Sequence, residues 1–132
     1  MPSAVLDTSV LVRYLTNDDP AKADAARSLI ASQPDGALLL PDVAITELGW
    51  VLLRVYRWPI PEVARALRAV VTHKSIEVAA PRLWLDIADD LEQGHGLVDA
   101  YLQRTALHAG ISRLVTFDAD MRPIGGVSCQ SP

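Results

Sequence analysis

Short apolar runs alternate along the chain with longer stretches in which apolar residues recur at helical spacing. The short runs predict strands at residues 4–6, 37–40, 75–78 and 113–117, with a weak fifth strand near Val127. The longer stretches predict helices at residues 8–15, 20–32, 43–56, 61–72, 82–93 and 97–109. Strands that alternate with helices are typical of a mainly parallel sheet covered on both faces. We therefore expect an α/β fold of three layers, α/β/α, around a central, mainly parallel sheet of four to five strands.

Two of the predicted helices should meet solvent differently. The helix at 43–56, which Asp42 is placed to cap, is apolar nearly all round and should therefore be interior. The helix at 82–93 shows amphipathic spacing, which predicts a surface position. Its solvated face is expected to carry the acids Asp86, Asp89, Asp90 and Glu92.

The composition is typical of a compact globular protein. Half of the 132 residues are hydrophobic, and domains most often contain about 100–150 residues, so residues 1–132 are expected to form one domain. The only cysteine, Cys129, excludes an internal disulfide and a cysteine-based zinc site. No apolar stretch approaches the roughly 20 residues that span a bilayer, and no leader pattern opens the chain. We therefore expect a cytoplasmic protein with no membrane segment.

The net charge of −4 argues against a protein that binds nucleic acid through a basic surface field. A nuclease that uses divalent metal ions partly escapes this objection. Its carboxylates make the total charge negative, while the bound ions supply positive charge at the site.

Four acids interrupt otherwise apolar elements, where charged residues are rarely found without a partner. Asp7 and Asp118 each follow a predicted strand at its carboxyl end. Glu47 is the only charge between Asp42 and Arg54, and should not be a simple solvated residue. Asp99 shares a helix stripe with small and apolar residues, so it should point toward packing.

The carboxyl ends of parallel strands form the binding crevice of open α/β sheets, which is where Asp7 and Asp118 fall. Two helices are able to bring Glu47 and Asp99 to the same place. Four converging carboxylates repel one another unless a cation compensates them, and oxygen ligands favour hard divalent ions. This pattern favours Mg²⁺ or Mn²⁺ as cofactor.

Each acid also has an ordinary explanation that the sequence leaves open. Asp7 is placed to cap the helix that begins at Thr8, and Asp99 is an acid in the first turn of its helix. Glu47 is able to pair with a buried arginine. Asp118 with Asp120 fits an ordinary turn. Four such acids in one small domain favour chemistry over four separate structural roles.

The sequence resembles the PIN-domain nucleases, and above all the VapC toxins of VapBC toxin–antitoxin pairs. Four segments carry the resemblance in order and spacing, namely residues 5–15, 46–52, 98–102 and 114–118. The resemblance implies a metal site made by Asp7, Glu47, Asp99 and Asp118. It also implies cleavage of structured RNA such as tRNA or rRNA, dimerisation into a homodimer, and a VapB-like antitoxin that inserts a peptide across the acidic groove.

In the mechanism that this resemblance suggests, Asp7, Asp99 and Asp118 fix an ion that polarises the scissile phosphate and activates a water. Glu47 orients that water or binds a second ion. The expected products carry 5′-phosphate and 3′-hydroxyl ends.

Two departures from the family pattern leave the number of metal ions open. Ser9 stands where the family often has Asn, and Gly96 stands where many members carry an extra Asp. Asp120 is a candidate for the missing oxygen, and Ser9 or Thr116 for holding a carboxylate or a water. Arg13, Arg54 and Arg57 are candidates for contacts with RNA phosphates, with Arg54 and Arg57 expected on one helix side.

Two other functions are alternatives to the nuclease. A phosphoacceptor receiver domain is also a parallel α/β fold, but it needs paired acids after the first strand and a late lysine. Here Thr8 and Ser9 follow Asp7, and no lysine occurs after Lys74. The stronger alternative is a catalytically inactive PIN-like module that binds RNA or an antitoxin.

Overall fold

The computed structural model describes the whole chain, Met1–Pro132. The helices are α1 (Thr8–Leu15), α2 (Pro20–Ser32), α3 (Asp42–Arg54), α4 (Ile60–Val71), α5 (Pro81–Glu92) and α6 (Leu97–His108). The strands, all two or three residues long, are β1 (Ala4–Val5), β2 (Leu38–Leu39), β3 (Ile76–Glu77), β4 (Arg113–Val115) and β5 (Ser128–Gln130). Each predicted element is therefore present, with its ends shifted by a few residues at most. None of the helices has both the length and the apolar character that crossing a bilayer requires.

The strands form two separate parallel sheets. One sheet has the order β1-β2-β3, with Ala4 opposite Leu38 and Leu38 opposite Ile76. The other contains only β4 and β5, with Leu114 opposite Cys129. The predicted α/β class and the parallel pairing are confirmed. The expected single sheet of four to five strands is instead divided within this chain, because α5 and α6 carry the chain away from β1 before β4 begins.

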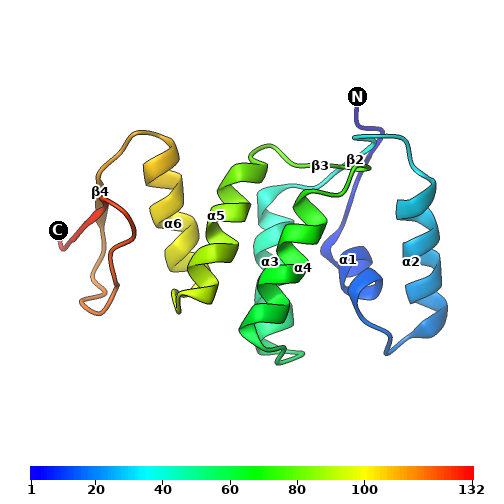
Figure 1. Ribbon diagram of the computed structural model, residues 1–132, viewed down its shortest axis with the longest axis horizontal. Helices are drawn as coiled ribbons and strands as arrows, with labels where there is room; N and C mark the ends of the chain where they lie inside the picture. The colour runs from blue at the N-terminus through cyan, green and yellow to red at the C-terminus, as the bar shows by residue number, and fades with distance from the viewer.

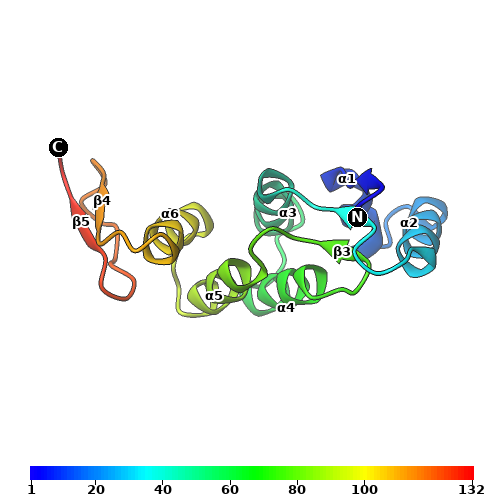
Figure 2. The ribbon, with the colours of Figure 1, turned by 90° about the horizontal axis from the view of Figure 1, so that it is seen from above.

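The molecule is elongated, with its two sheets far apart. In Figure 1, α1, α2 and the first sheet lie toward one end, α3 and α4 lie in the middle, and β4 and β5 lie at the opposite end beyond α5 and α6. The second view gives the same order along the long axis (Figure 2). We call α5, α6, β4 and β5 the arm. The strand that precedes Asp7 and the strand that precedes Asp118 are therefore not neighbours in this chain.

Helix α3 buries one face and leaves the other bare. Ile45, Leu48 and Leu52 have no solvent-exposed surface and join the main core, which also contains Trp84 of α5. On the opposite face, Val43 is 77% exposed. The prediction that this helix is interior is therefore wrong for its outer face. The physical reason is that no element of the same chain packs over that side.

The prediction that the acids of α5 form a solvated face is wrong for Asp90, whereas Asp89 and Glu92 are exposed as expected. Asp90 is only 4% exposed, and its two carboxylate oxygens each accept a hydrogen bond of 2.7 Å from the Arg104 guanidinium on α6. Arg68 on α4 donates to Asp89 at 2.7 Å and also pairs with Glu92. Arg68 on α4 and Arg104 on α6 therefore pair with acids of α5, and these ion pairs hold α5 between the two helices.

Candidate functional site

Asp7 lies where the first strand turns into the first helix. It is the N-cap of α1, and its carboxylate accepts hydrogen bonds from the backbone N–H of Ser9 at 3.3 Å and from the Ser9 hydroxyl. These bonds from Ser9 hold the pKa of the Asp7 carboxyl below its ordinary value, because they favour the charged form. Asp7 is therefore an anion near neutral pH. Asp7 therefore caps α1, and at the same time Ser9 holds the Asp7 carboxylate in place.

Glu47 projects from the bare face of α3 and shares a hollow with Asp7. This hollow has a volume of about 330 Å³ and is also lined by Thr8, Pro41 and Val43. Glu47 is exposed, and no Lys, Arg or His pairs with it. The expectation that Glu47 is not a solvated residue is therefore wrong in this chain, and the alternative of a buried arginine partner is also excluded.

A groove continues from Glu47 along the outer face of α3. A second hollow of about 570 Å³ is lined by Glu47, Trp50 and Val98, and a third of about 650 Å³ by Trp50, Val98 and Asp99. Because neighbouring hollows share lining residues, they form one path, which we call the α3 groove. Asp99 is half-buried at its far end, in the first turn of α6. Asp7, Glu47 and Asp99 thus border one surface.

A glycine permits α6 to begin close against α3. A Cβ atom on Gly49 would lie 2.8 Å from the side chain of Leu97, the first residue of α6. A larger residue at Gly49 therefore requires the Leu97 side chain to move.

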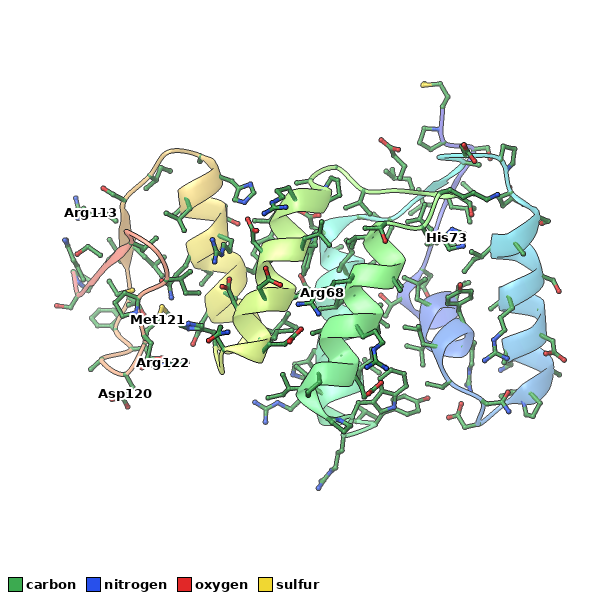
Figure 3. The ribbon with its side chains drawn as sticks, in the orientation of Figure 1. Arg68, His73, Arg113, Asp120, Met121 and Arg122 are labelled. Atoms are coloured by element: carbon green, nitrogen blue, oxygen red, sulfur yellow. The ribbon has the colours of Figure 1, made fainter.

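Asp118 lies far from the other three acids, in the loop between β4 and β5. The Asp118 backbone N–H donates to the Thr116 hydroxyl at 3.0 Å, and the Asp118 carboxylate accepts from the backbone N–H of Asp120 at 2.9 Å. This is the ordinary turn that the sequence left open. Figure 3 labels Asp120 in this loop, at the end of the molecule opposite His73.

The four acids have the chemistry of a divalent-ion site but not its geometry. Carboxylate oxygens are the right donors for Mg²⁺ or Mn²⁺, but no group of three or more His, Cys, Asp or Glu side chains in the chain is placed to hold a metal ion. Asp7 and Glu47 share a hollow, Asp99 lies further along the α3 groove, and Asp118 lies on the arm. The donor chemistry suits the ion, but the positions within one chain do not.

The three candidate arginines differ in their surroundings. Arg13 donates to Asp18 at 3.2 Å and is therefore already paired. Arg54 is exposed and lines the same hollow as Asp99. Arg57 lies beyond the end of α3 with a φ of 54°, so the expectation that it shares a helix side with Arg54 is wrong. The helix ends at Arg54, a few residues before Pro59, which leaves Arg54 as the arginine that faces the groove.

Asp42 has a role that the sequence did not reveal. It does not cap α3 through its side chain, as Pro41 is the N-cap. Its carboxylate instead accepts hydrogen bonds from Trp84 Nε1 at 3.0 Å and from the Tyr101 hydroxyl at 3.1 Å. Burial, with added effect from Asp42, raises the pKa of Tyr101. Because these partners lie 42 and 59 residues away, no local pattern signals the contact.

The comparison with known families decides the relationship. The sequence model of the PIN domain family matches residues 4–127, a range that includes all four acids. This chain belongs to the PIN domain family. Among solved structures, this PIN-domain chain is similar to VapC20 of Mycobacterium tuberculosis, described as a Sarcin-Ricin loop cleaving toxin. The identity is 22% and the TM-score 0.45, over 90% of this chain and 92% of that one. No curated protein sequence matches the chain.

Proposed function

We propose that this PIN-domain protein is an endoribonuclease of the VapC type, the toxin of a toxin–antitoxin pair. It hydrolyses phosphodiester bonds of structured RNA such as tRNA or rRNA, with Mg²⁺ or Mn²⁺ as cofactor. The observation that carries the proposal is that Asp7 and Glu47 line one hollow at the carboxyl end of β1. Open α/β sheets bind ligands at this position. Membership of the PIN family supports it.

The residues of the α3 groove have distinct parts in this proposal. Asp7, held as an anion by Ser9, and Glu47 supply negative oxygens at one end of the groove. Asp99 supplies another at the far end, beside the exposed Arg54, which is placed to contact an RNA phosphate. Asp118 is the fourth carboxylate of the proposed site.

The same groove suits the antitoxin. The bare side chain of Trp50 lies between the carboxylates of Glu47 and Asp99, and the bare side chain of Val43 lines the groove beside Glu47. A peptide that carries both apolar and basic residues matches this surface. We propose that a VapB-like antitoxin covers the α3 groove with such a peptide, and that the toxin itself is a homodimer.

Removal of divalent ions is expected to abolish RNA cleavage by the purified protein. EDTA should stop the cleavage of an end-labelled structured RNA, and an excess of Mg²⁺ or Mn²⁺ should restore it, because the carboxylates need a cation near the scissile phosphate. Circular dichroism with and without EDTA is the control for folding. Cleavage that continues unchanged in EDTA contradicts the proposed cofactor.

One observation favours the alternative of an inactive PIN-like binding module, namely that three ligands do not meet in one chain. The same experiment separates the two functions. RNA binding without cleavage at any concentration of Mg²⁺ or Mn²⁺ supports the binding module.

Substitution of Arg54→Gln is expected to weaken RNA binding to a similar extent for all RNA sequences. Loss of one phosphate contact should lower the slope of log Kd against log salt concentration by roughly 0.7–0.9. Fluorescence anisotropy with labelled RNA in EDTA, where the RNA stays intact, measures this slope. Arg65→Gln is the matched control, since Arg65 is an exposed arginine of α4 that pairs with Glu62 away from the groove. Equal slopes for the two variants contradict the role of Arg54.

A further inference from the structure

Both sheets end in a strand with an unpaired edge. β1 pairs only with β2, and β4 pairs only with β5. The backbone N–H of Ala4 donates to the carbonyl of Ala37, just before β2, and that of Leu6 donates to the carbonyl of Leu39 in β2, so the alternation of a strand turns the N–H of Val5 toward the free edge. An exposed strand edge is a template for pairing with another chain, and natural proteins normally cover it.

Apolar side chains accompany both free edges. Val5 of β1 is 65% exposed, and it lines the hollow that contains Asp7 and Glu47. On the arm, Val115 of β4 is 51% exposed and Phe117, just after β4, is 89% exposed. Parallel strands are normally buried on both faces. The two edges therefore have matching chemistry, and each lacks the cover that such strands have elsewhere.

Ion pairs and hydrogen bonds hold the arm in a position in which β4 lies away from β1 of its own chain. Arg68 ties α5 to α4, and the pair of Asp90 with Arg104 ties α6 to α5. The fully buried Gln103 of α6 then ties down the segment before β5, since it accepts from the Ile124 N–H at 2.6 Å and donates to the Arg122 carbonyl at 2.9 Å. Closure of the arm onto its own β1 requires at least one of these links to break.

A second copy of the chain satisfies both edges without breaking any of these links. We propose that two copies exchange their arms, so that β4 of each copy pairs in parallel with β1 of the other. The resulting sheets have the order β3-β2-β1-β4-β5, with the last two strands from the partner. Reciprocal exchange is a closed, two-fold arrangement.

The exchange also completes the carboxylate site, and in this respect it rests on the proposed function. Asp7 follows the carboxyl end of β1, and Asp118 follows the carboxyl end of β4. Parallel pairing places both ends at the same edge of the sheet, so the partner's Asp118 arrives beside Asp7 and Glu47. The absence of a three-ligand group within one chain is then the expected state of a site that is shared between two chains.

Complementation between two inactive variants tests the shared site. Asp7→Asn and Asp118→Asn chains are purified separately, mixed in equal amounts, unfolded in urea and refolded together. In an exchanged heterodimer, one site combines the intact Asp7 of one chain with the intact Asp118 of the other. Since half of the dimers are mixed and each holds one intact site, the mixture should regain about a quarter of the wild-type cleavage rate.

The results of this mixing distinguish the two proposals. A mixture that stays as inactive as each variant, while the wild-type protein cleaves RNA after the same refolding, overturns the exchange and leaves the nuclease function standing. A wild-type protein that never cleaves RNA counts against the proposed function instead. In that case the exchange is decided by a second measurement that needs no activity.

Disulfide trapping supplies that measurement. One chain carries Val5→Cys and the other Val115→Cys, both with Cys129→Ser, and the two are refolded together and oxidised. Exchange predicts a covalent heterodimer on a non-reducing gel, because disulfides form only between cysteines brought within a few ångströms. The matched control replaces Val5→Cys by Asp24→Cys, an exposed position on α2. A Val5→Cys mixture that yields no more cross-linked dimer than the control overturns the proposal.

Discussion

Substitution of Asp7→Asn is expected to reduce RNA cleavage by at least about 100-fold and to leave the protein folded. A loss of about 3 kcal/mol of transition-state stabilisation gives this factor, and electrostatic stabilisation by a bound ion typically contributes several kcal/mol. Asn is nearly the same size as Asp and still accepts a hydrogen bond from the Ser9 N–H, so the cap of α1 is retained. Single-turnover cleavage of a labelled structured RNA measures the effect.

The matched control is Asp24→Asn, which makes the same change of charge on an exposed residue of α2. Its cleavage rate should equal that of the wild-type protein, and both variants should unfold at nearly the wild-type urea concentration. An Asp7→Asn protein with full activity refutes the assignment of Asp7. An Asp7→Asn protein that has lost activity because it no longer folds is recognised from its urea curve.

Features that depend on neighbouring residues were predictable from the sequence. The strand before Asp7, the helix after it and the capping geometry between them all follow from a few consecutive residues. The turn that joins Asp118 to Asp120 is local in the same way. The positions of the helices and strands, and the parallel arrangement, were therefore available without a structure.

Features that depend on distant partners were not predictable. The apolar pattern of α3 predicts burial of both faces, but only one face is buried within the chain, because the pattern does not show which elements pack against it. Asp90 belongs to an acidic run that looks solvated, and only the position of Arg104 on the next helix reveals that it is buried. The same limit applies to the separation of Asp118 from Asp7.

Substitution of Asp90→Ala is expected to lower the free energy of unfolding by about 3 kcal/mol. Breaking a buried ion pair by removal of one partner typically costs about 3–5 kcal/mol, because the remaining charge is left uncompensated. The lower end applies here, since the Arg104 side chain keeps 24% of its surface exposed. The two 2.7 Å hydrogen bonds that Arg104 donates to Asp90 are also the largest reason that the pKa of Arg104 is raised. Urea denaturation followed by circular dichroism measures the change.

Two further variants separate the loss of the ion pair from the general effect of a substitution in α5. Asp89→Ala removes an acid from the same helix, but the Asp89 side chain is 66% exposed, so the expected loss is below about 1 kcal/mol. The double variant Asp90→Leu with Arg104→Met leaves no charge unpaired and should recover most of the stability that Asp90→Ala loses. A double variant as unstable as Asp90→Ala contradicts this account, because the cost then comes from packing at the seam between α5 and α6. The pair of Asp90 with Arg104 is one of the links that hold the arm together in its extended arrangement.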